Sequence, residues 1–293
     1  MIRHRGLWVA LFTTPCMVLF AFIYAAPILT VAATAFTEYT AFSPPSFAGF
    51  ENFISIFQDG NFIKAIKNTL IWVILQTTFH VALGLAVALI MRRKPFGWKL
   101  ARTFYMIPNI VPTAATGVMF SLLLNPSFGA AAALFGDGQA PNLFGNSAYA
   151  FWTVTATWIF YSAFNTIIFL AEISAIDSTI YEAASIDGAR PWQEDLYITL
   201  PLLKKCIGTC VVLASVAMVS QFDIIYMTTR GGPGTSTLNL PMYLYKTATL
   251  ENNYGRANAV GVVQIILGIT LVLLIQKIFD AGGSKSKEEA ELL

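Results

Sequence analysis

The chain has 293 residues, of which 56% are hydrophobic and only 12% are charged. A soluble domain of this length carries about 25% charged residues, so most of this surface is not built to face water. The formal net charge of +2 is small, and no cluster of Lys and Arg is interleaved with aromatic residues, which excludes a nucleic-acid-binding protein. Lipid is the solvent that this composition predicts.

The three cysteines, at positions 16, 206 and 210, all fall inside apolar stretches. Cys206 and Cys210 are four residues apart and share a helix face, but no histidine or acidic residue completes a metal-binding set. We therefore interpret the cysteines as small packing residues and predict no metal site and no disulfide framework.

Long apolar segments recur along the whole chain. A transmembrane helix needs roughly 20 mostly apolar residues. The segments that qualify lie at about 8–34, 68–91, 103–125, 149–171, 206–228 and 257–278. The first begins like a signal peptide, but it stays uncharged up to Glu38, far beyond the apolar region of such a peptide. We predict an all-α polytopic protein with six spans and a single transmembrane domain at 1–293.

The distribution of Lys and Arg between alternate loops predicts the orientation. With the N-terminus inside, the cytoplasmic segments hold 13 of these residues and the outer loops hold 5. Both termini are therefore predicted to be cytoplasmic. Residues 126–148 are broken by glycine and proline, and we expect an outer loop there with a short interfacial helix near 130–135.

The longest and most polar connection is the predicted cytoplasmic loop at about 172–205. Thr179 and Glu182 have the S/T-x-x-E spacing of a capping box, which would begin a short helix. Gly188 is placed to end that helix in the left-handed conformation, and Pro191 to begin a second helix. Two short helices are therefore expected to meet at this corner.

The first of these helices is expected to have only about two turns, too few to be stable alone in water. It carries the small or apolar residues Ile180, Tyr181, Ala183 and Ala184, which we expect to be exposed. Such a helix can dock into a groove on a partner. The alternative is a simple connector at the membrane interface, capped because every helix end leaves backbone groups to satisfy.

Three short motifs follow one another within about twenty residues of this loop: Glu182-Ala183-Ala184, Asp187-Gly188-Ala189 and Ile198-Thr199-Leu200-Pro201. In order and spacing they resemble the EAA motif of binding-protein-dependent ABC importer permeases. The match departs at Lys205, where the family often has proline.

A second stretch is similar to the end of the fifth span and the following outer loop of the carbohydrate-uptake permeases, the maltose and glycerol-3-phosphate type. It consists of Phe222-Asp223-Ile224-Ile225-Tyr226-Met227-Thr228, then Gly231, Gly232, Pro233 and Thr237, with Tyr254-Gly255-Arg256-Ala257 further on. The likeness follows the spans in order along the chain, which looks like the minimal six-span form of this family.

The resemblance implies a type I importer permease in the inner membrane of a prokaryote. It implies that the helix at 180–188 is a coupling helix seated in a cleft of a separate ATPase. The implied coupling residues are Glu182, Ala183, Ala184, Asp187, Gly188, Ala189, Ile198, Leu200 and Pro201. The implied partners are a second homologous permease subunit, two ATPase subunits and an extracytoplasmic solute-binding protein.

No G-x-x-x-x-G-K-[ST] phosphate loop occurs in the sequence, so any ATP hydrolysis belongs to another chain. We therefore expect a subunit that is not an enzyme and binds no cofactor itself, with ATP and Mg held by the partner ATPase.

Aromatic and amide side chains in the expected fourth span are candidates for the substrate pathway. Trp158, Tyr161 and Asn165 are spaced to share one helix face. Aromatic faces and amides suit a sugar, whose ring has apolar C–H faces and a rim of hydroxyls. The alternative is that such aromatic residues anchor the span at the membrane interface.

Ionisable groups inside membrane spans are expensive and indicate function. Asp223 is such a group, with Gln221 and Tyr226 near it, and His80 is another. For both residues the alternative is a structural role, such as a hydrogen bond from Asp223 to Arg230 or to a hydroxyl on a neighbouring helix.

The expected third span contains Pro108 and Pro112 on either side of Asn109. Proline removes a helix hydrogen bond and clashes with the preceding turn, so we predict a kink or break there, in an element that lines the translocation path.

Taken together, these features predict a permease subunit that imports a carbohydrate or related solute by alternating access. The alternatives are an ion-coupled secondary transporter, which would have paired broken helices and several buried charges, and a membrane-embedded enzyme with clustered His, Asp or Glu. These residues fit a sugar, an oligosaccharide, a polyol or a glycerol-phosphate ester as the solute. The sequence is equally compatible with a homodimer and with a heterodimer of permease subunits.

Overall fold

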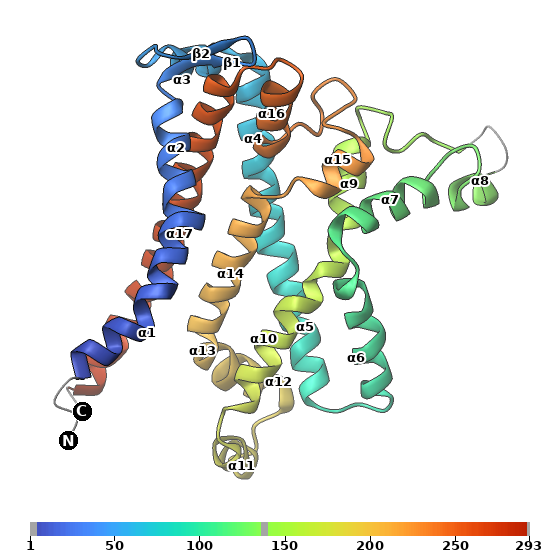
Figure 1. Cartoon of the computed structure of the whole chain (residues 1–293). Coiled ribbons are helices and arrows are strands. Elements are labelled where there is room, and N and C mark those ends of the chain that lie inside the picture. The colour runs from blue at the N-terminus through green and yellow to red at the C-terminus, as the bar shows by residue number, and fades with distance from the viewer. Residues whose placement is uncertain (1–4, 136–139, 292–293) are drawn as a thin grey trace. The chain divides into compact units, whose positions relative to one another are not determined.

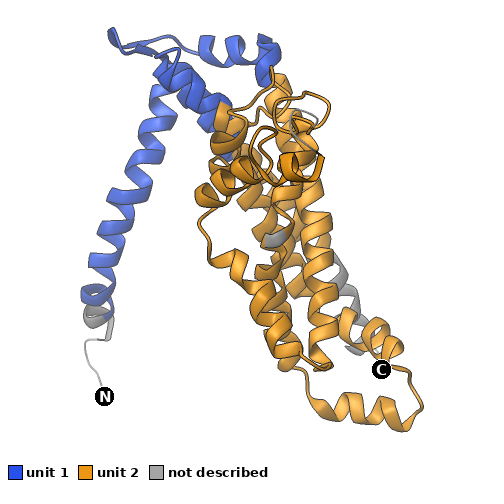
Figure 2. Cartoon of the chain, turned by 90° about the vertical axis from the view of Figure 1, so that its right-hand side faces the viewer, with its two compact units in different colours: residues 1–62, 243–265 blue, residues 63–242, 266–293 orange. Residues whose placement is uncertain are grey.

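The computed structural model describes residues 5–135 and 140–291, and helices form most of this part of the chain (Figure 1). The chain divides into two compact units, one of residues 1–62 and 243–265 and the other of residues 63–242 and 266–293 (Figure 2). Three short segments lie outside the described residues. They are residues 136–139 of the predicted outer loop and the chain ends at 1–4 and 292–293, which were predicted to be cytoplasmic.

The first unit begins with one apolar helix that contains a short π-helical segment. Its parts are α1 (Arg5–Phe20), the π-helix (Ala21–Ala25) and α2 (Ala26–Thr34). Within it, Val9–Thr34 is 26 residues long and apolar enough to cross a membrane, in agreement with the span predicted at 8–34.

An antiparallel hairpin follows this helix. It consists of β1 (Thr37–Thr40) and β2 (Ser43–Phe47), with Thr37 paired to Phe47, and α3 (Glu51–Gln58) comes next. The prediction of an all-α protein missed this hairpin. Pro44 and Pro45 lie inside β2, and proline is tolerated in a strand only at an edge, so the segment carries no strand signal in the sequence.

Asp59, directly after α3, is the centre of a polar cluster in the first unit. Tyr243 Oη donates to Asp59 Oδ2 at 2.7 Å, and Arg256 Nη2 donates to the same oxygen at 2.6 Å. Partial burial acts to raise the pKa of Asp59, but the hydrogen bonds from Tyr243 and the Asn61 N–H and the charge of Arg256 together lower it below its ordinary value. The charged carboxylate ties the end of α3 to α16 (Leu240–Thr249) and α17 (Tyr254–Glu291).

The second unit contains the remaining helices, several of them extended by short π- or 3-10 segments; α4, α16 and α17 have residues in both units. The first group is α4 (Gly60–Leu75), a π-helix (Gln76–His80), α5 (Val81–Arg92), α6 (Trp98–Met106), a 3-10 helix (Ile107–Ile110), α7 (Thr113–Leu123), α8 (Ala130–Phe135), α9 (Ala150–Thr157), a 3-10 helix (Ile159–Ser162) and α10 (Ala163–Ser174). The second group is α11 (Ser178–Ile186), α12 (Pro191–Glu194), a π-helix (Asp195–Thr199), α13 (Leu200–Leu202), α14 (Lys204–Val219) and α15 (Asp223–Thr228). The short helix predicted at 130–135 is α8.

Among the described residues, four helices are long and apolar enough to cross a membrane, and up to six if each of two bent helix pairs is one span. The four are Val9–Thr34, Gly60–Arg92, Lys204–Thr228 and Tyr254–Phe279. One bent pair joins α10 to α11 at 74°, where the sequence placed the end of a span and the start of the loop.

The other bent pair lies within the span predicted at 103–125, where a kink or break was expected. Trp98–Ile110 and Thr113–Leu123 meet at 99°, as the paths of α6 and α7 in Figure 1 make plain. Pro112 stands between them with an extended backbone, φ −56° and ψ 141°, and has no N–H to continue a helix. The break predicted at Pro108 and Pro112 is therefore confirmed.

Three helices, α5, α10 and α14, pack together as the core of the second unit. Their buried side chains are Val81, Ala88, Phe169, Ile173, Leu203, Cys206, Cys210 and Ala214. Cys206 and Cys210 thus lie in this core, whereas Cys16 is exposed. Gly84 lets α5 and α10 approach closely, and Thr166 Oγ1 donates across the contact to Gly84 O at 3.0 Å. Small residues at such contacts are typical of helix packing in membranes.

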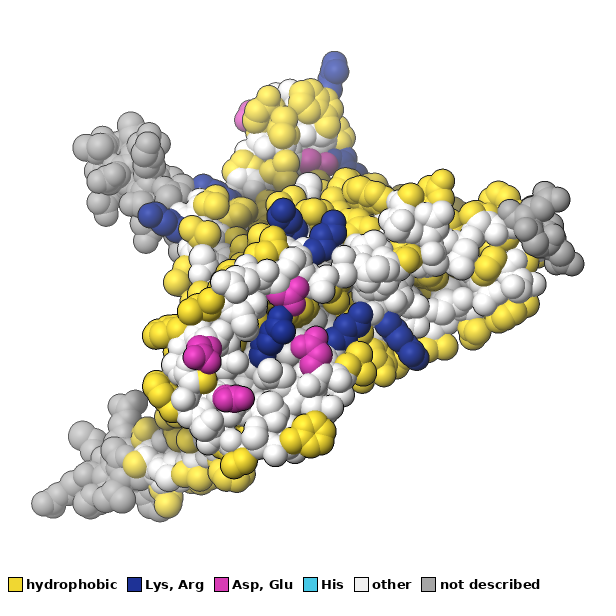
Figure 3. Space-filling model, turned by 90° about the horizontal axis from the view of Figure 1, so that it is seen from above, with side chains coloured by type: hydrophobic (Ala, Val, Ile, Leu, Met, Phe, Trp, Pro, Cys, Tyr) yellow, Lys and Arg dark blue, Asp and Glu magenta, His cyan; other side chains and the backbone are white. Residues whose placement is uncertain are grey.

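Large apolar side chains cover much of the surface that the described residues present. Phe12 is 75% exposed and Phe22 78% exposed on the first helix. Seen from above, broad hydrophobic areas surround the charged side chains (Figure 3). Exposed apolar surface on this scale is unfavourable in water and is expected where lipid is the solvent.

Replacing Gly84 with alanine is expected to destabilise the core. A Cβ atom there would lie 2.7 Å from Asn165 Cβ and 2.9 Å from Ser162 O, so α5 and α10 must separate. We expect the free energy of unfolding to fall by about 1–3 kcal/mol, measured by thermal unfolding in detergent. Gly268→Ala in α17 is the matched control, because no atom lies within 4 Å of the added carbon; equal effects at both positions would contradict the packing argument.

Candidate functional site

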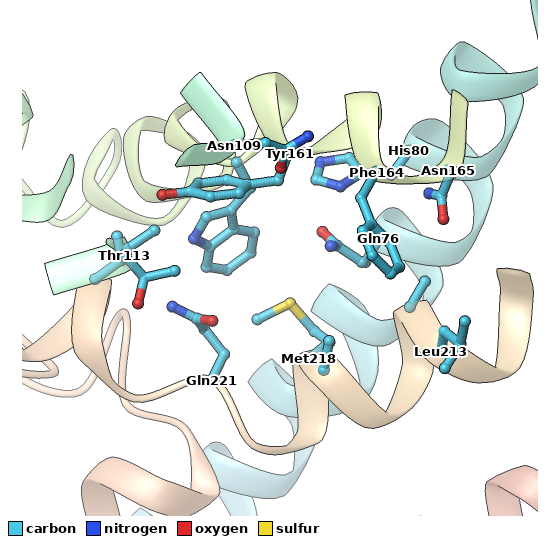
Figure 4. Close-up of a pocket in the computed structure, with 14 residues that line it drawn as sticks. Gln76, His80, Asn109, Thr113, Tyr161, Phe164, Asn165, Leu213, Met218 and Gln221 are labelled. Carbon is cyan, nitrogen blue, oxygen red and sulfur yellow. The ribbon is translucent and has the colours of Figure 1, made fainter. Parts of the chain in front are cut away.

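A cavity of about 230 Å³ lies within the second unit (Figure 4). Its wall is built from the π-helix between α4 and α5, the bend between α6 and α7, the α9–α10 region, and the α14–α15 region. The lining residues are Gln76, His80, Asn109, Thr113, Trp158, Tyr161, Phe164, Asn165, Leu213, Ala214, Ala217, Met218, Gln221 and Ile224. Elements far apart in the sequence therefore contribute to one site.

Four of the residues predicted for the substrate pathway meet in this lining: Trp158, Tyr161, Asn165 and Gln221. Trp158 and Asn165 are each 4% exposed, so neither is an anchor in contact with the membrane surface. The bend at Pro108 and Pro112 brings Asn109 to the same space.

Asp223 and Tyr226, also predicted, lie outside the lining. Asp223 is exposed at the start of α15 and accepts a hydrogen bond from Thr113 Oγ1 at 2.6 Å. A hydrogen bond of this kind, to a hydroxyl on a neighbouring helix, is what the sequence predicted if Asp223 has a structural role. Tyr226 stacks on Phe222 with ring centroids 5.1 Å apart.

Of the nine buried side-chain polar atoms without hydrogen-bond partners in the described chain, four belong to residues that line this cavity. They are Gln76 Oε1, Asn109 Nδ2, Trp158 Nε1 and Gln221 Nε2, one acceptor and three donors. Leaving such an atom unpaired costs about 1–3 kcal/mol, so packing alone does not explain four of them together. The arrangement can instead exchange hydrogen bonds with a polar solute.

The aromatic rings of the lining are held in place from behind. Trp72 packs edge-on against Trp158 with ring centroids 5.0 Å apart and stacks on Phe151 at 4.6 Å. Tyr161 Oη donates to Thr116 Oγ1 at 2.8 Å. The two rings therefore present fixed apolar faces to the cavity, while the hydroxyl of Tyr161 is already engaged.

The outer-loop residues predicted at 231–237 do not line the cavity but support it. The Gly232–Pro233 peptide is cis, and the buried Thr237 donates through Oγ1 to Gly232 O at 2.8 Å. Just beyond this turn, Asn239 Nδ2 donates to Gln221 O at 2.5 Å. Asn239 thereby fixes the backbone of a cavity residue.

At the other end of the second unit, the cap of α11 lies two residues before the predicted one. The helix is capped by Asp177, whose Oδ1 accepts from Thr179 N at 3.0 Å, and not by a capping box of Thr179 and Glu182. Asp177 is as good a cap as threonine and stands two residues earlier. Its hydrogen bonds with Thr179 lower the pKa of the Asp177 carboxyl.

The end of α11 follows the prediction. Gly188 has φ +79°, its N–H donates to Ser185 O at 3.1 Å, and Ala189 N donates to Ala184 O at 2.9 Å. This pair of bonds is a Schellman motif, which requires the left-handed residue that glycine supplies. Pro191 then begins α12 as its first residue.

The residues of the predicted coupling motif differ in their exposure. Glu182, Ala183, Asp187, Gly188 and Pro201 are exposed, whereas Ala184, Ala189, Ile198 and Leu200 are half-buried. The most exposed large apolar side chain of α11 is Ile186, which is 87% exposed and was not predicted. The expectation that Tyr181 and Ala184 are exposed is wrong, since both are half-buried.

Two arginines at the end of α5 hold this loop. Arg92 Nη2 lies 2.9 Å from Glu194 Oε2, and Arg92 Nη1 donates to Thr199 Oγ1 at 2.7 Å. Arg93 Nη2 pairs with Asp195 Oδ2 at 2.5 Å. In the sequence both arginines indicate only the orientation of the chain, because no sequence pattern shows which loop their side chains contact.

Tyr181 connects α11 to the same contacts. The Arg92 guanidinium lies 4.0 Å from the centroid of the Tyr181 ring, and Tyr181 Oη is 3.1 Å from Thr199 Oγ1. Thr199 is fully buried. A cation–π contact and a shared hydroxyl therefore fix α11 to α5 and to the π-helix that follows α12.

Residues 80–283 match the family described as the binding-protein-dependent transport system inner membrane component. The chain belongs to this family. It is accordingly a permease subunit of an ABC importer in the cell membrane, and its role is transport rather than enzymatic catalysis.

Curated relatives cover most of the permease. It is 30% identical to the sulfoquinovosyl glycerol transport system permease of Agrobacterium fabrum over 90% of this chain and 88% of that one. It is 31% identical to the inner membrane ABC transporter permease YcjO of Escherichia coli over 82% of each chain. It is 29% identical to the diacetylchitobiose uptake permease of Streptomyces coelicolor, over 87% of this chain and 78% of that one.

Solved structures share the fold. A bacterial ABC transporter involved in the import of the acidic polysaccharide alginate superposes with a TM-score of 0.82 at 23% identity, covering 94% of this chain and 96% of that one. The methionine ABC transporter MetNI gives a TM-score of 0.55 at 19% identity, covering 79% of this chain and 98% of that one.

Removing the Arg92 charge is expected to loosen the loop. In Arg92→Gln, Glu194 would be left with 14% of its side chain exposed and without its partner at 2.9 Å. We expect a loss of about 1–3 kcal/mol in the free energy of unfolding and faster hydrogen exchange over 178–199. The double variant Arg92→Gln/Glu194→Gln should recover part of the loss, and Arg190→Gln, at an exposed position in the same loop, should have little effect. Additive effects of the two single changes would contradict the proposed pairing.

Proposed function

We propose that the permease carries a carbohydrate or a closely related hydroxyl-rich solute into the cytoplasm through the cavity lined by Gln76, Trp158 and Gln221. The observation that carries this proposal is the convergence of four unpaired polar atoms on one space bounded by fixed aromatic rings. Amides can bond hydroxyls at the rim of a sugar, and aromatic faces can cover its apolar C–H surfaces.

The composition of the lining supports a neutral solute. Among the described residues that line the cavity there is no Asp or Glu, and His80 is the one ionisable side chain besides Tyr161. A secondary transporter that binds a cation or proton needs such groups within the membrane, so the lining disfavours that alternative. The relatives that import sulfoquinovosyl glycerol and diacetylchitobiose support the carbohydrate class.

The proposed coupling route runs along two helices that join the loop to the cavity. Gly60–Arg92 is continuous, with Arg92 in the loop contacts and Gln76 and His80 in the cavity wall. α14 begins just after α13 and reaches the cavity at Leu213 and Met218. Both cavity residues of the first helix lie in its π-helical segment, a feature frequent at functional sites. A displacement of α11 would therefore reach the solute through rigid elements.

α11 is the proposed contact with a separate ATPase, as the family resemblance implied. It presents Ile180 and Ile186 as exposed apolar side chains at 41% and 87%, and it lies beyond the ends of α5 and α10 in Figure 1. An exposed apolar face on a capped two-turn helix suits docking into a groove. Alternation between inward- and outward-facing states would follow from movements of two such subunits.

The proposed assembly contains two permease subunits, two ATPase subunits and an extracytoplasmic solute-binding protein, with ATP and Mg on the ATPase. A solved alginate transporter bound to its oligosaccharide-loaded periplasmic protein supports the last of these partners. In this assembly the chain has six spans and both termini in the cytoplasm, which the Lys and Arg asymmetry supports.

Replacing cavity glutamines is expected to impair transport. Gln76→Leu and Gln221→Leu keep similar volumes but remove the unpaired Oε1 and Nε2 atoms. If each atom bonds the solute, each variant should lose about tenfold in uptake rate by reconstituted complex, the effect of one lost hydrogen bond of about 1.4 kcal/mol. Gln58→Leu, at an exposed position in α3, is the control and should transport normally. Normal uptake by both cavity variants would exclude this site.

The backbone at Gly188 provides a separate test of coupling. Gly188→Val should abolish solute-stimulated ATP hydrolysis while the binding protein keeps its affinity for solute, because valine strongly disfavours φ +79°. Gly188→Asn should retain most coupling, since asparagine tolerates the left-handed region and no atom lies within 4 Å of the added Cβ. Equal coupling in the two variants would show that the turn does not matter.

A further inference from the structure

A second polar cavity, of about 350 Å³, lies where the ends of α5 and α10 meet α6 and α11. Three basic residues, Arg92, Lys94 and Arg102, contribute to its lining, and none of the described residues that line it is acidic. The charge of Arg92 is compensated by Glu194 and Asp195. Within the described part of the chain, Lys94 and Arg102 make no ion pair. The cavity therefore presents two uncompensated positive charges.

The turn between α5 and α6 is shaped to bring these charges together. Lys94 has φ +48°, a left-handed conformation that is uncommon for a residue other than glycine, and Gly97 has φ +77°. Trp98 and Arg102 are four residues apart on α6 and both line the cavity. The chain reversal thus lets Lys94, just after α5, and Arg102, on α6, line one cavity.

The other face of α6 is apolar and exposed. Leu100 and Phe104, also four residues apart, are 67% and 70% exposed. A tryptophan between basic residues and an apolar face is typical of the boundary between headgroups and hydrocarbon. The helix therefore joins a cationic pocket to a surface suited to acyl chains.

We propose that this cavity binds an anionic phospholipid, with its phosphate between Lys94 and Arg102 and its acyl chains along Leu100 and Phe104. Basic pockets between membrane helices recognise such headgroups by charge. A soluble phosphate anion would use the two cations but leave the apolar face of α6 uncovered. Because Arg92 and Tyr181 line the same cavity, the headgroup lies beside the contacts that hold α11. The proposal does not depend on the identity of the transported solute.

Native mass spectrometry of the full chain in mild detergent tests the proposal. With phosphatidylglycerol and phosphatidylcholine supplied in equal amounts, the wild type should retain phosphatidylglycerol preferentially. Lys94→Gln/Arg102→Gln should weaken phosphatidylglycerol binding by roughly tenfold to thirtyfold, the effect of removing two charges near a headgroup. Lys64→Gln/Lys67→Gln removes two charges elsewhere, on α4, and should change nothing.

The charge-conserving variant Lys94→Arg/Arg102→Lys should keep the preference, which separates charge from side-chain shape. Undiminished phosphatidylglycerol binding by the neutral variant would overturn the proposal. If the neutral variant does not fold, the wild type decides, because equal retention of the two lipids would overturn it. Inorganic phosphate, titrated against lipid-free chain, distinguishes the source of the anion: phosphate binding without a preference between the lipids would replace the lipid with a soluble anion.

Discussion

The Arg92 guanidinium brings together elements that the chain separates by about a hundred residues. It pairs with Glu194, donates to Thr199 and lies over the ring of Tyr181, so the end of α5, the helix α11 and the π-helix after α12 share one set of contacts. A half-buried cation with several partners holds its position better than an exposed ion pair, because moving it would leave the half-buried Glu194 carboxylate without a compensating charge. The loop is therefore joined to the membrane helices by more than its two chain connections.

The cavity depends on the same helix. The helix Gly60–Arg92 contains Gln76 and His80 in its π-helical segment. One turn further on, Gly84 lets α10 approach closely because it has no side chain. Trp158 and Asn165, which precede and follow the 3-10 segment before α10, pack against this helix and line the same cavity. The π-helical and 3-10 segments lie beside the polar cavity, whereas the core packs between regular α-helices. Such local departures leave room for side chains that a continuous helix would direct elsewhere.

The two polar regions of the second unit have different chemistry. The cavity at Gln76 and Gln221 offers amides and aromatic faces without carboxylates, which suits a neutral hydroxylated solute. The cavity at Lys94 and Arg102 offers uncompensated positive charge beside an apolar helix face, which suits an anionic lipid. Arg92 lines the second cavity and Gln76 the first, and one helix contains both residues. The proposed solute site, the proposed lipid site and the loop contacts therefore share one helix.

The sequence by itself determined the family, the positions of four long apolar helices, the break at Pro112 and the left-handed turn at Gly188, because each depends on local composition or on the backbone limits of proline and glycine. It also grouped Trp158, Tyr161 and Asn165 correctly in space, since helical spacing is local. The tertiary structure decided the hairpin, the cap at Asp177, the exclusion of Asp223 from the cavity and the partners of Arg92. These depend on which distant segments pack together, and in an apolar chain the pattern of hydrophobic residues identifies a helix but not its neighbour.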